Sequence, residues 1–261
     1  MRLRTSFLAF AFTIAAIFTA AAQDPIRGLD LTSPDMTTAE MTRGQVEEAV
    51  KTAPGGHGAD FNGKRLSGLD LSGLDFSGAD FHAARLNHTN LSHAKLDGAT
   101  LDQAWALDAD LTGASLVKAS LFATQMAGAR LDGANLTGSR VTADLTGAHL
   151  ANARFEDANC SADEKNQSMG LMRATFKSAD LSHADLTRAN LARADLRFAK
   201  LSGANFAEAT LREADASGAD LRGAVLQGAD TSGLDLDSAR IDAASVPYLA
   251  KAIHLDRASK E

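Results

Sequence analysis

The sequence predicts an all-β solenoid, and three observations carry that prediction. A five-residue unit recurs through most of the 261 residues. A period of five matches neither the 3.6 residues of a helix turn nor the 2.0 of a strand, so the chain must turn a corner once per unit. Only 5% of the residues are aromatic although 45% are hydrophobic, which fits a narrow, regular interior.

The unit is Ala, then Asp or Asn, then Leu or Phe, then two polar or small residues, as in Ala-Asp-Phe-Asn-Gly at 59–63. Centred on the Leu or Phe, 37 units fall into three registers, over 61–141, 145–160 and 171–246. The centre is Leu or Phe in 29 units, and the residue two before it is Ala in 29. We expect the centre residue and the Ala two before it to point inward. If four units close one coil, residues 20 apart stack at about 4.8 Å, which predicts a β-helix of about nine coils.

These units resemble those of pentapeptide-repeat proteins, and the resemblance covers residues 59–246. It implies a right-handed quadrilateral β-helix. Members of that family range from DNA-mimicking inhibitors that protect DNA gyrase to exported or lumenal proteins without a known activity. The resemblance therefore specifies a fold but not a function.

The first 22 residues read as a secretory signal peptide. Arg2 and Arg4 precede an apolar run from Phe7 to Phe18, and an Ala-x-Ala site predicts cleavage after Ala22. The competing reading is an uncleaved membrane anchor, but an apolar stretch of about 16 residues is shorter than the roughly 20 that a bilayer requires. We expect a periplasmic or secreted protein with no stable membrane span after cleavage.

A solenoid exposes an apolar coil at each end, so short α-helical caps are expected at both. The N-terminal segment 23–58 contains an amphipathic pattern over 37–52, with Thr37 or Thr38 as N-cap. At the other end, Ser245 can cap a helix from about Val246 to Ala258, which makes 247–261 the C-terminal capping segment. The resemblance offers a second use for this C-terminal helix, as a homodimer contact.

Two register breaks interrupt the repeats. A step of four separates Val141 from Leu145, and a step of eleven separates Cys160 from Leu171. The segment 161–170 cannot supply inward Leu residues, so it predicts a loop that bulges from the solenoid. Such a loop is either a tolerated insertion or a partner contact made by Asp163, Glu164, Lys165, Asn166 and Gln167.

Trp105 and Arg85 are the other candidate partner contacts. Trp105 takes an outward position usually filled by Asp or Asn, and Arg85 lies one coil away on the same face. The spacing predicts a cation–π stack between them, which decorates the wall or contributes to a ligand site. Cys160 takes a centre position and is expected inside as a small apolar filler, with intermolecular pairing as the alternative.

No catalytic set, cofactor motif or metal-ligand spacing emerges, so a non-enzymatic structural or binding protein is expected, with a macromolecular partner, most simply protein. The alternative is a DNA mimic that inhibits or protects a DNA-binding enzyme such as gyrase. Residues 59–246 carry 25 acidic and 18 basic residues, a net charge of -7. A solenoid of about nine coils is about 45 Å long, and duplex DNA of that length carries about 26 negative charges. The net charge of the repeats therefore disfavours DNA mimicry, and its negative sign disfavours direct nucleic-acid binding.

Overall fold

The structure is a computed structural model that describes residues 30–53, 58–162 and 173–261. The predicted signal peptide, 1–22, lies outside the described residues, as do Asp163, Glu164, Lys165, Asn166 and Gln167. The chain divides after Leu31 into two units, of which Thr32–Glu261 contains all the repeats.

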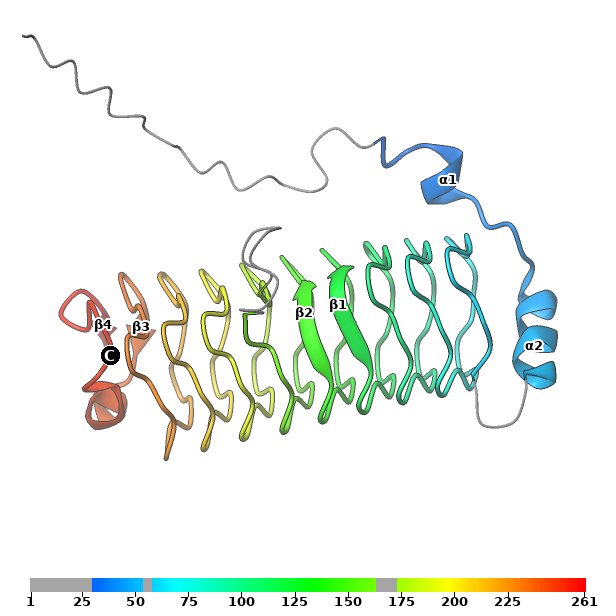
Figure 1. The fold of residues 1–261 in the computed structure, drawn as a ribbon. Helices are drawn as coiled ribbons and strands as arrows, with labels where there is room; N and C mark the ends of the chain where they lie inside the picture. The colour runs from blue at the N-terminus through cyan, green and yellow to red at the C-terminus, as the bar shows by residue number, and fades with distance from the viewer. Residues whose placement is uncertain (1–29, 54–57, 163–172) are drawn as a thin grey trace, which may run out of the picture. The chain divides into compact units, whose positions relative to one another are not determined.

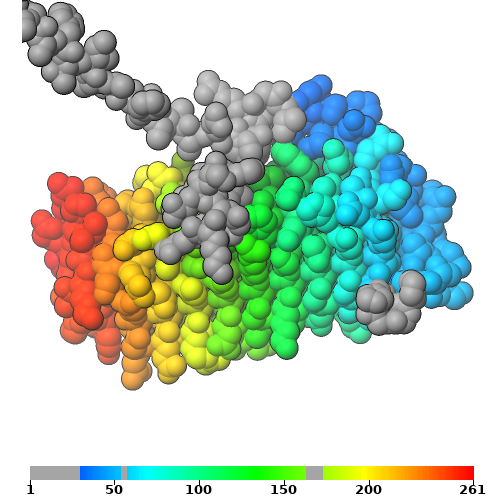
Figure 2. Space-filling view, viewed as in Figure 1, coloured from blue at the N-terminus to red at the C-terminus, as the bar shows by residue number. Residues whose placement is uncertain are grey.

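The repeats form coils joined by parallel bridges between residues 20 apart (Figure 1). Four columns of bridges run through the coils, and we call them faces A, B, C and D. They begin with the pairs Asp60–Asp80, Arg65–Arg85, Asp70–Asn90 and Asp75–Lys95. Figure 2 shows the outer surface of the coils as successive parallel ridges. Two longer strands, β1 (Ser120–Gln125) and β2 (Arg140–Asp144), pair in parallel within this array.

Each face repeats one set of backbone hydrogen bonds. On face A, the N–H groups of Phe61 and Gly63 donate to the next coil, Phe61 to the Asp80 carbonyl at 2.7 Å, and Asp80 N–H donates back to Ala59 at 2.9 Å. A turn closes most corners, as where Lys64 N–H donates to the Phe61 carbonyl at 3.0 Å. The third residue of that turn, Gly63, has φ +65°, the left-handed conformation of a type II turn, which explains the frequent Gly at this position.

The interior is the predicted apolar column. Leu91, Leu111 and Leu131 are each 0% exposed, and the residues before them form consecutive bridges on face C. Most of the alanines two positions before the centres are buried as well, as Ala109 illustrates. The prediction of one inward-pointing column is therefore confirmed.

Both register breaks appear in the bridge pattern. Arg130 pairs with His149, only 19 residues on, so the step of four is absorbed as a coil shortened by one residue. Asp144 pairs with Thr175, 31 residues on, so one coil carries an eleven-residue insertion between Cys160 and Phe176. Leu171, counted above as a repeat centre, lies outside the described residues.

The N-terminal helix is shorter than predicted and is preceded by one more turn of helix. α1 covers Pro34–Thr37 and α2 covers Arg43–Thr52. The prediction of one helix over 37–52 capped by Thr37 or Thr38 is wrong, because Thr42 forms a capping box with Gln45. The Gln45 side chain accepts from Thr42 N–H at 2.8 Å, and two reciprocal bonds outweigh the single bond that an isolated Thr offers.

α2 packs on the first coil and satisfies part of its open edge. Val46 is 0% exposed and belongs to the same core as the repeats. Arg43 Nη1 donates to the Asp70 carbonyl at 2.7 Å, and Arg43 Nη2 donates to the Ser72 carbonyl at 3.2 Å. These are the two face C carbonyls that a preceding coil would otherwise have paired.

Arg43→Met should lower the free energy of unfolding by about 1 kcal/mol, because it keeps the aliphatic stem and removes both donors to the coil edge. Chemical denaturation followed by circular dichroism measures the change. Lys51→Met, on the exposed side of the same helix, serves as control and should change stability by less than about 0.5 kcal/mol. Equal effects of the two substitutions would contradict this role for Arg43.

The C-terminal segment also differs from its prediction. β3 (Arg240–Ile241) pairs in parallel with β4 (Ser259–Lys260), and η2 (Ala243–Leu249) is a 3-10 helix between them. The predicted α-helix from Val246 to Ala258 is wrong. Pro247 lies inside η2, where it lacks the amide that an α-helix needs, and Ile253 continues the rungs of face B instead.

Candidate functional site: face B

Face B is the column in which the bridged residues depart most often from the Asp or Asn that the repeat usually places there. Its charge changes sign along the column: arginines lie at the N-terminal end, aspartates lie at the C-terminal end, and Trp105 lies between them. The bridged residues, in order, are Arg65, Arg85, Trp105, Gln125, Asp144, Thr175, Asp195, Asp215, Asp235 and Ile253.

Trp105 lies directly between Arg85 and Gln125, as predicted, but the expected stack is wrong. Arg85 Nη1 donates to the Ala83 carbonyl at 3.2 Å, and Gln125 Nε2 donates to the Ala123 carbonyl at 3.3 Å. A charged donor gains more from a carbonyl on its own coil than from a partly buried ring, so Arg85 folds back on its turn. Within the described chain, the cation–π contact is Arg140 over the Phe122 ring at 4.3 Å.

Hydrogen-bonding capacity remains beside Trp105. Arg85 Nε and Gln125 Oε1 are both buried and lack a hydrogen-bond partner among the described residues. Buried groups of this kind usually have partners, so they leave this part of face B incompletely satisfied.

The C-terminal half of face B is organised around Asp195, whose side chain is 4% exposed. Arg197 donates to it through Nε at 2.8 Å and through Nη2 at 2.5 Å, a bidentate pair, and Arg173 Nη2 lies 3.5 Å from Asp195 Oδ2. Arg197 also lies 3.6 Å from Asp215. A nearly buried carboxylate thus ties two arginines to the wall.

Burial by itself raises the pKa of Asp195. Hydrogen bonds from the side chain and the backbone of Arg197, with the positive charges of Arg197 and Arg173, outweigh it, so the pKa lies below its usual value. Asp195 is therefore ionised throughout the neutral range, and the arginine arrangement persists there.

Phe198 stands at the corner where face B meets face C. Its side chain is among the most exposed large apolar groups, at 59%, and its φ of 59° is one that a bulky residue rarely adopts. Most corners place Gly or a small or polar residue there. Phe198 was not among the predicted contacts, although an aromatic side chain in the usual Gly position is a signal in the sequence.

The predicted loop contact, Asp163 to Gln167, lies outside the described residues. The residues that flank the insertion, Ala162 and Arg173, are described, and we call them its N-terminal and C-terminal foot. Ala162 N–H donates to the Ala192 carbonyl at 3.1 Å at the end of face A, and Arg173 binds Asp195 on face B. The C-terminal foot of the insertion therefore shares face B with Trp105, three rungs away along the column.

Little else in the described chain offers chemistry. Cys160 is 0% exposed, and burial raises its pKa to about 12, so it is an apolar filler as predicted. In residues 30–53, 58–162 and 173–261, no three His, Cys, Asp or Glu side chains are placed to hold a metal ion. Within the same ranges, no helix is long and apolar enough to cross a bilayer.

The repeat geometry has a counterpart among known families. The model of the family "Pentapeptide repeats" matches eight copies, over residues 57–87, 65–103, 108–142, 171–206 and 204–241. The chain belongs to the pentapeptide-repeat family. No curated protein matches the chain.

Among solved structures, QnrB1 shares the fold, and two further proteins are similar in sequence. QnrB1, described as a plasmid-mediated fluoroquinolone resistance protein, is 14% identical with a TM-score of 0.55, over 77% of this chain and 91% of that one. HetL, involved in heterocyst differentiation regulation in Nostoc sp. strain PCC 7120, is 32% identical over 68% of this chain and 84% of that one, with a TM-score of 0.32. A thylakoid-lumen pentapeptide-repeat protein of Arabidopsis thaliana is 27% identical over 44% and 77%, with a TM-score of 0.31.

Ion pairs between pentapeptide coils neutralise many of the outward carboxylates. Arg193 lies 2.7 Å from Glu213, and Arg188 lies 2.7 Å from Asp157, each pair joining neighbouring coils. Lys200 bridges to Asp180 on the coil before it at 3.2 Å. The acidic side chains thus form a mixed-charge wall rather than rows of free negative charge.

Proposed function

We propose that this protein is an exported, non-enzymatic pentapeptide-repeat scaffold that binds a macromolecular partner, most simply a protein, through face B. The proposal includes a periplasmic or secreted location, supported by the sequence of residues 1–22, and a right-handed quadrilateral β-helix closed by its terminal segments. The observation that carries it is the gathering of Trp105, Phe198 and the Arg173 foot of the insertion on one face and its corner.

This combination has the chemistry of an interface. Aromatic and arginine side chains are enriched in protein interfaces, and the sequence of 161–170 predicts a loop, a kind of segment that often carries contacts on a rigid scaffold.

The test combines localisation with capture. After fractionation, we expect the full-length protein to crosslink one specific macromolecule in the exported compartment. Trp105→Ala and Arg85→Ala should each reduce capture, whereas Arg130→Ala, a bridge-position arginine on face C, should not. Equal loss from Arg85→Ala and Arg130→Ala would remove face B from the proposal.

Phe198 separates binding from folding. Because its φ is 59°, Phe198→Gly should fold more stably than Phe198→Ala by about 1 kcal/mol, since Gly adopts the left-handed conformation without a Cβ penalty. Both variants remove the ring, so both should lose capture to the same extent. Denaturation curves and the capture assay measure the two effects, and retained capture by either variant would exclude Phe198 as a contact.

The second candidate is a DNA mimic that occupies a DNA-binding enzyme such as gyrase. The fold likeness to QnrB1 favours it, and the inter-coil pairing of carboxylates with arginines disfavours it. Inhibition or protection of purified gyrase by the protein, together with absence of an exported pool, would favour this candidate over the scaffold.

A further inference from the structure

The C-terminal segment pairs with the last coil on three of its four faces, in part on faces A and B. On face C, β4 pairs with β3. On face B, Leu236 N–H donates to the Ile253 carbonyl at 3.1 Å. On face A, Gly233 N–H donates to the Lys251 carbonyl at 2.9 Å. These contacts supply part of the pairing that a following coil would have supplied; on face A, Ala229 O and Thr231 N–H have no main-chain partner in the described chain.

Face D has no such partner. The next rung would fall near residue 245, where the chain instead forms η2. Ala224 O, Leu226 N–H and Gly228 N–H point to that missing rung, and within the described chain none of them has a hydrogen-bond partner. One coil earlier the equivalent groups are all paired: Ala204 O with Val225 N–H, Phe206 N–H with Val225 O, and Glu208 N–H with Gln227 O.

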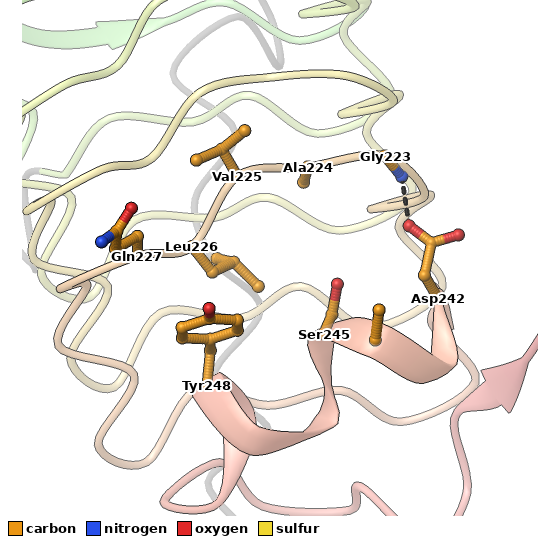
Figure 3. A pocket seen from close by; sticks show the side chains of 9 residues that line it. Gly223, Ala224, Val225, Leu226, Gln227, Asp242, Ser245 and Tyr248 are labelled. Atoms are coloured by element: carbon orange, nitrogen blue, oxygen red, sulfur yellow. Dashed lines mark hydrogen bonds between the residues drawn. The ribbon is translucent and has the colours of Figure 1, made fainter.

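A hollow of about 250 Å³ separates this open edge from η2 (Figure 3). The strand Gly223–Gln227 forms one side, and Ser245 and Tyr248 of η2 form the other. Val225 and Tyr248 border it and are 46% and 49% exposed. Asp242 accepts a hydrogen bond from Gly223 N–H at one end of the edge, and the carboxylate-bearing Glu208 lies beneath Gly228 at the other.

We infer that face D ends in a strand-addition site, where an extended peptide segment of a partner protein pairs in parallel as the missing rung. Three unpaired main-chain groups in β spacing require a partner that offers an N–H and two C=O groups in the same spacing, which an extended backbone does. Because η2 lines the opposite side of the hollow, the proposal is limited to one added strand.

The surroundings specify the side chains of this peptide. The residue aligned with Val225 points outward and contacts Val225 and Tyr248, so it is apolar. Its two neighbours point toward Ala224 and Leu226, beside η2, so they are small. Asp242 and Glu208 favour basic residues at the two ends. This site lies on a different face from the proposed binding face B and does not depend on it.

The probe is the synthetic peptide Lys-Ala-Val-Ala-Gly-Lys, titrated into the full-length protein and followed by amide hydrogen exchange. In the free protein, the Leu226 and Gly228 amides should exchange at least tenfold faster than those of Phe206 and Glu208. Saturating peptide should slow exchange at Leu226 and Gly228 at least tenfold and leave Phe206 and Glu208 unchanged. If Leu226 is already as protected as Phe206 at micromolar protein, the edge is not open and the proposal fails.

A matched peptide tests the main-chain pairing itself. N-methylation of the central Val removes the N–H that Ala224 O should accept, and it should weaken binding about tenfold. Val225→Asp, an outward substitution that leaves the interior intact, should weaken the unmodified peptide by a similar factor. Equal affinity for both peptides overturns strand addition, as does protection at Leu226 that rises with protein concentration alone, which would identify a second copy as the occupant.

Discussion

Leu131→Ala should lower the free energy of unfolding by about 3 kcal/mol. Leu131 is 0% exposed in the inward column, and its neighbours above and below are also rungs of the same column, so they cannot collapse into the space without breaking bridges. Substitutions of this kind cost about 2–5 kcal/mol, and the cost is highest where the site cannot relax. Urea denaturation followed by circular dichroism measures the change.

Arg130→Ala is the matched control for this core substitution. Arg130 is the residue before Leu131 on the same rung, but its side chain is exposed, so stability should change by less than about 0.5 kcal/mol. The two substitutions alter adjacent residues of one unit and differ only in the side of the wall they affect. Similar losses from both would contradict the inward and outward assignment on which the fold depends.

Asp195→Asn should cost about 2 kcal/mol at neutral pH. The substitution keeps the shape of the side chain and removes the charge that holds Arg173 and Arg197, and hydrogen bonds to charged groups contribute about 1.5–3 kcal/mol. Asp157→Asn is the control, because its pair with Arg188 is about half exposed on both sides and should contribute much less than the pairs of Asp195.

The contribution of Asp195 should also depend on pH in one direction. Its pKa is lower in the folded protein than the value of about 3.9 expected in the unfolded chain. The stabilisation is therefore fully present above about pH 4 and is lost as the pH falls through the folded-state pKa. Denaturation midpoints measured from pH 7 to pH 3 should fall more steeply for the unsubstituted protein than for Asp195→Asn, and parallel curves would contradict this.

The repeat was predictable because its inward and outward positions alternate in a fixed period. The burial of Leu131, the position of Cys160 and the four-residue step after Val141 all follow from counting centres along the chain. The period also holds after the insertion, because Thr175 returns to face B and Phe176, the centre that follows it, is buried in the inward column.

The ends and the site were less predictable because they depend on contacts that the period does not encode. The start of α2 depends on the reciprocal bonds between Thr42 and Gln45, and η2 depends on Pro247 and on the strand pairing of β4. On face B, the adjacency of Arg85 and Trp105 was predicted correctly. Whether Arg85 stacks on the Trp105 ring or donates to the Ala83 carbonyl depends on its rotamer, which the repeat period does not specify.

The bridge register of 20 residues makes length an adjustable property. Removing or duplicating one whole coil realigns every column with itself, so evolution can shift the spacing between α2 and η2 in steps of about 4.8 Å without redesigning either terminus. Along face B, the same step would carry Trp105 toward or away from the Arg173 foot. Adding or removing whole coils would thus change the distance between the two contact points in fixed steps and leave the side chains of each contact point unchanged.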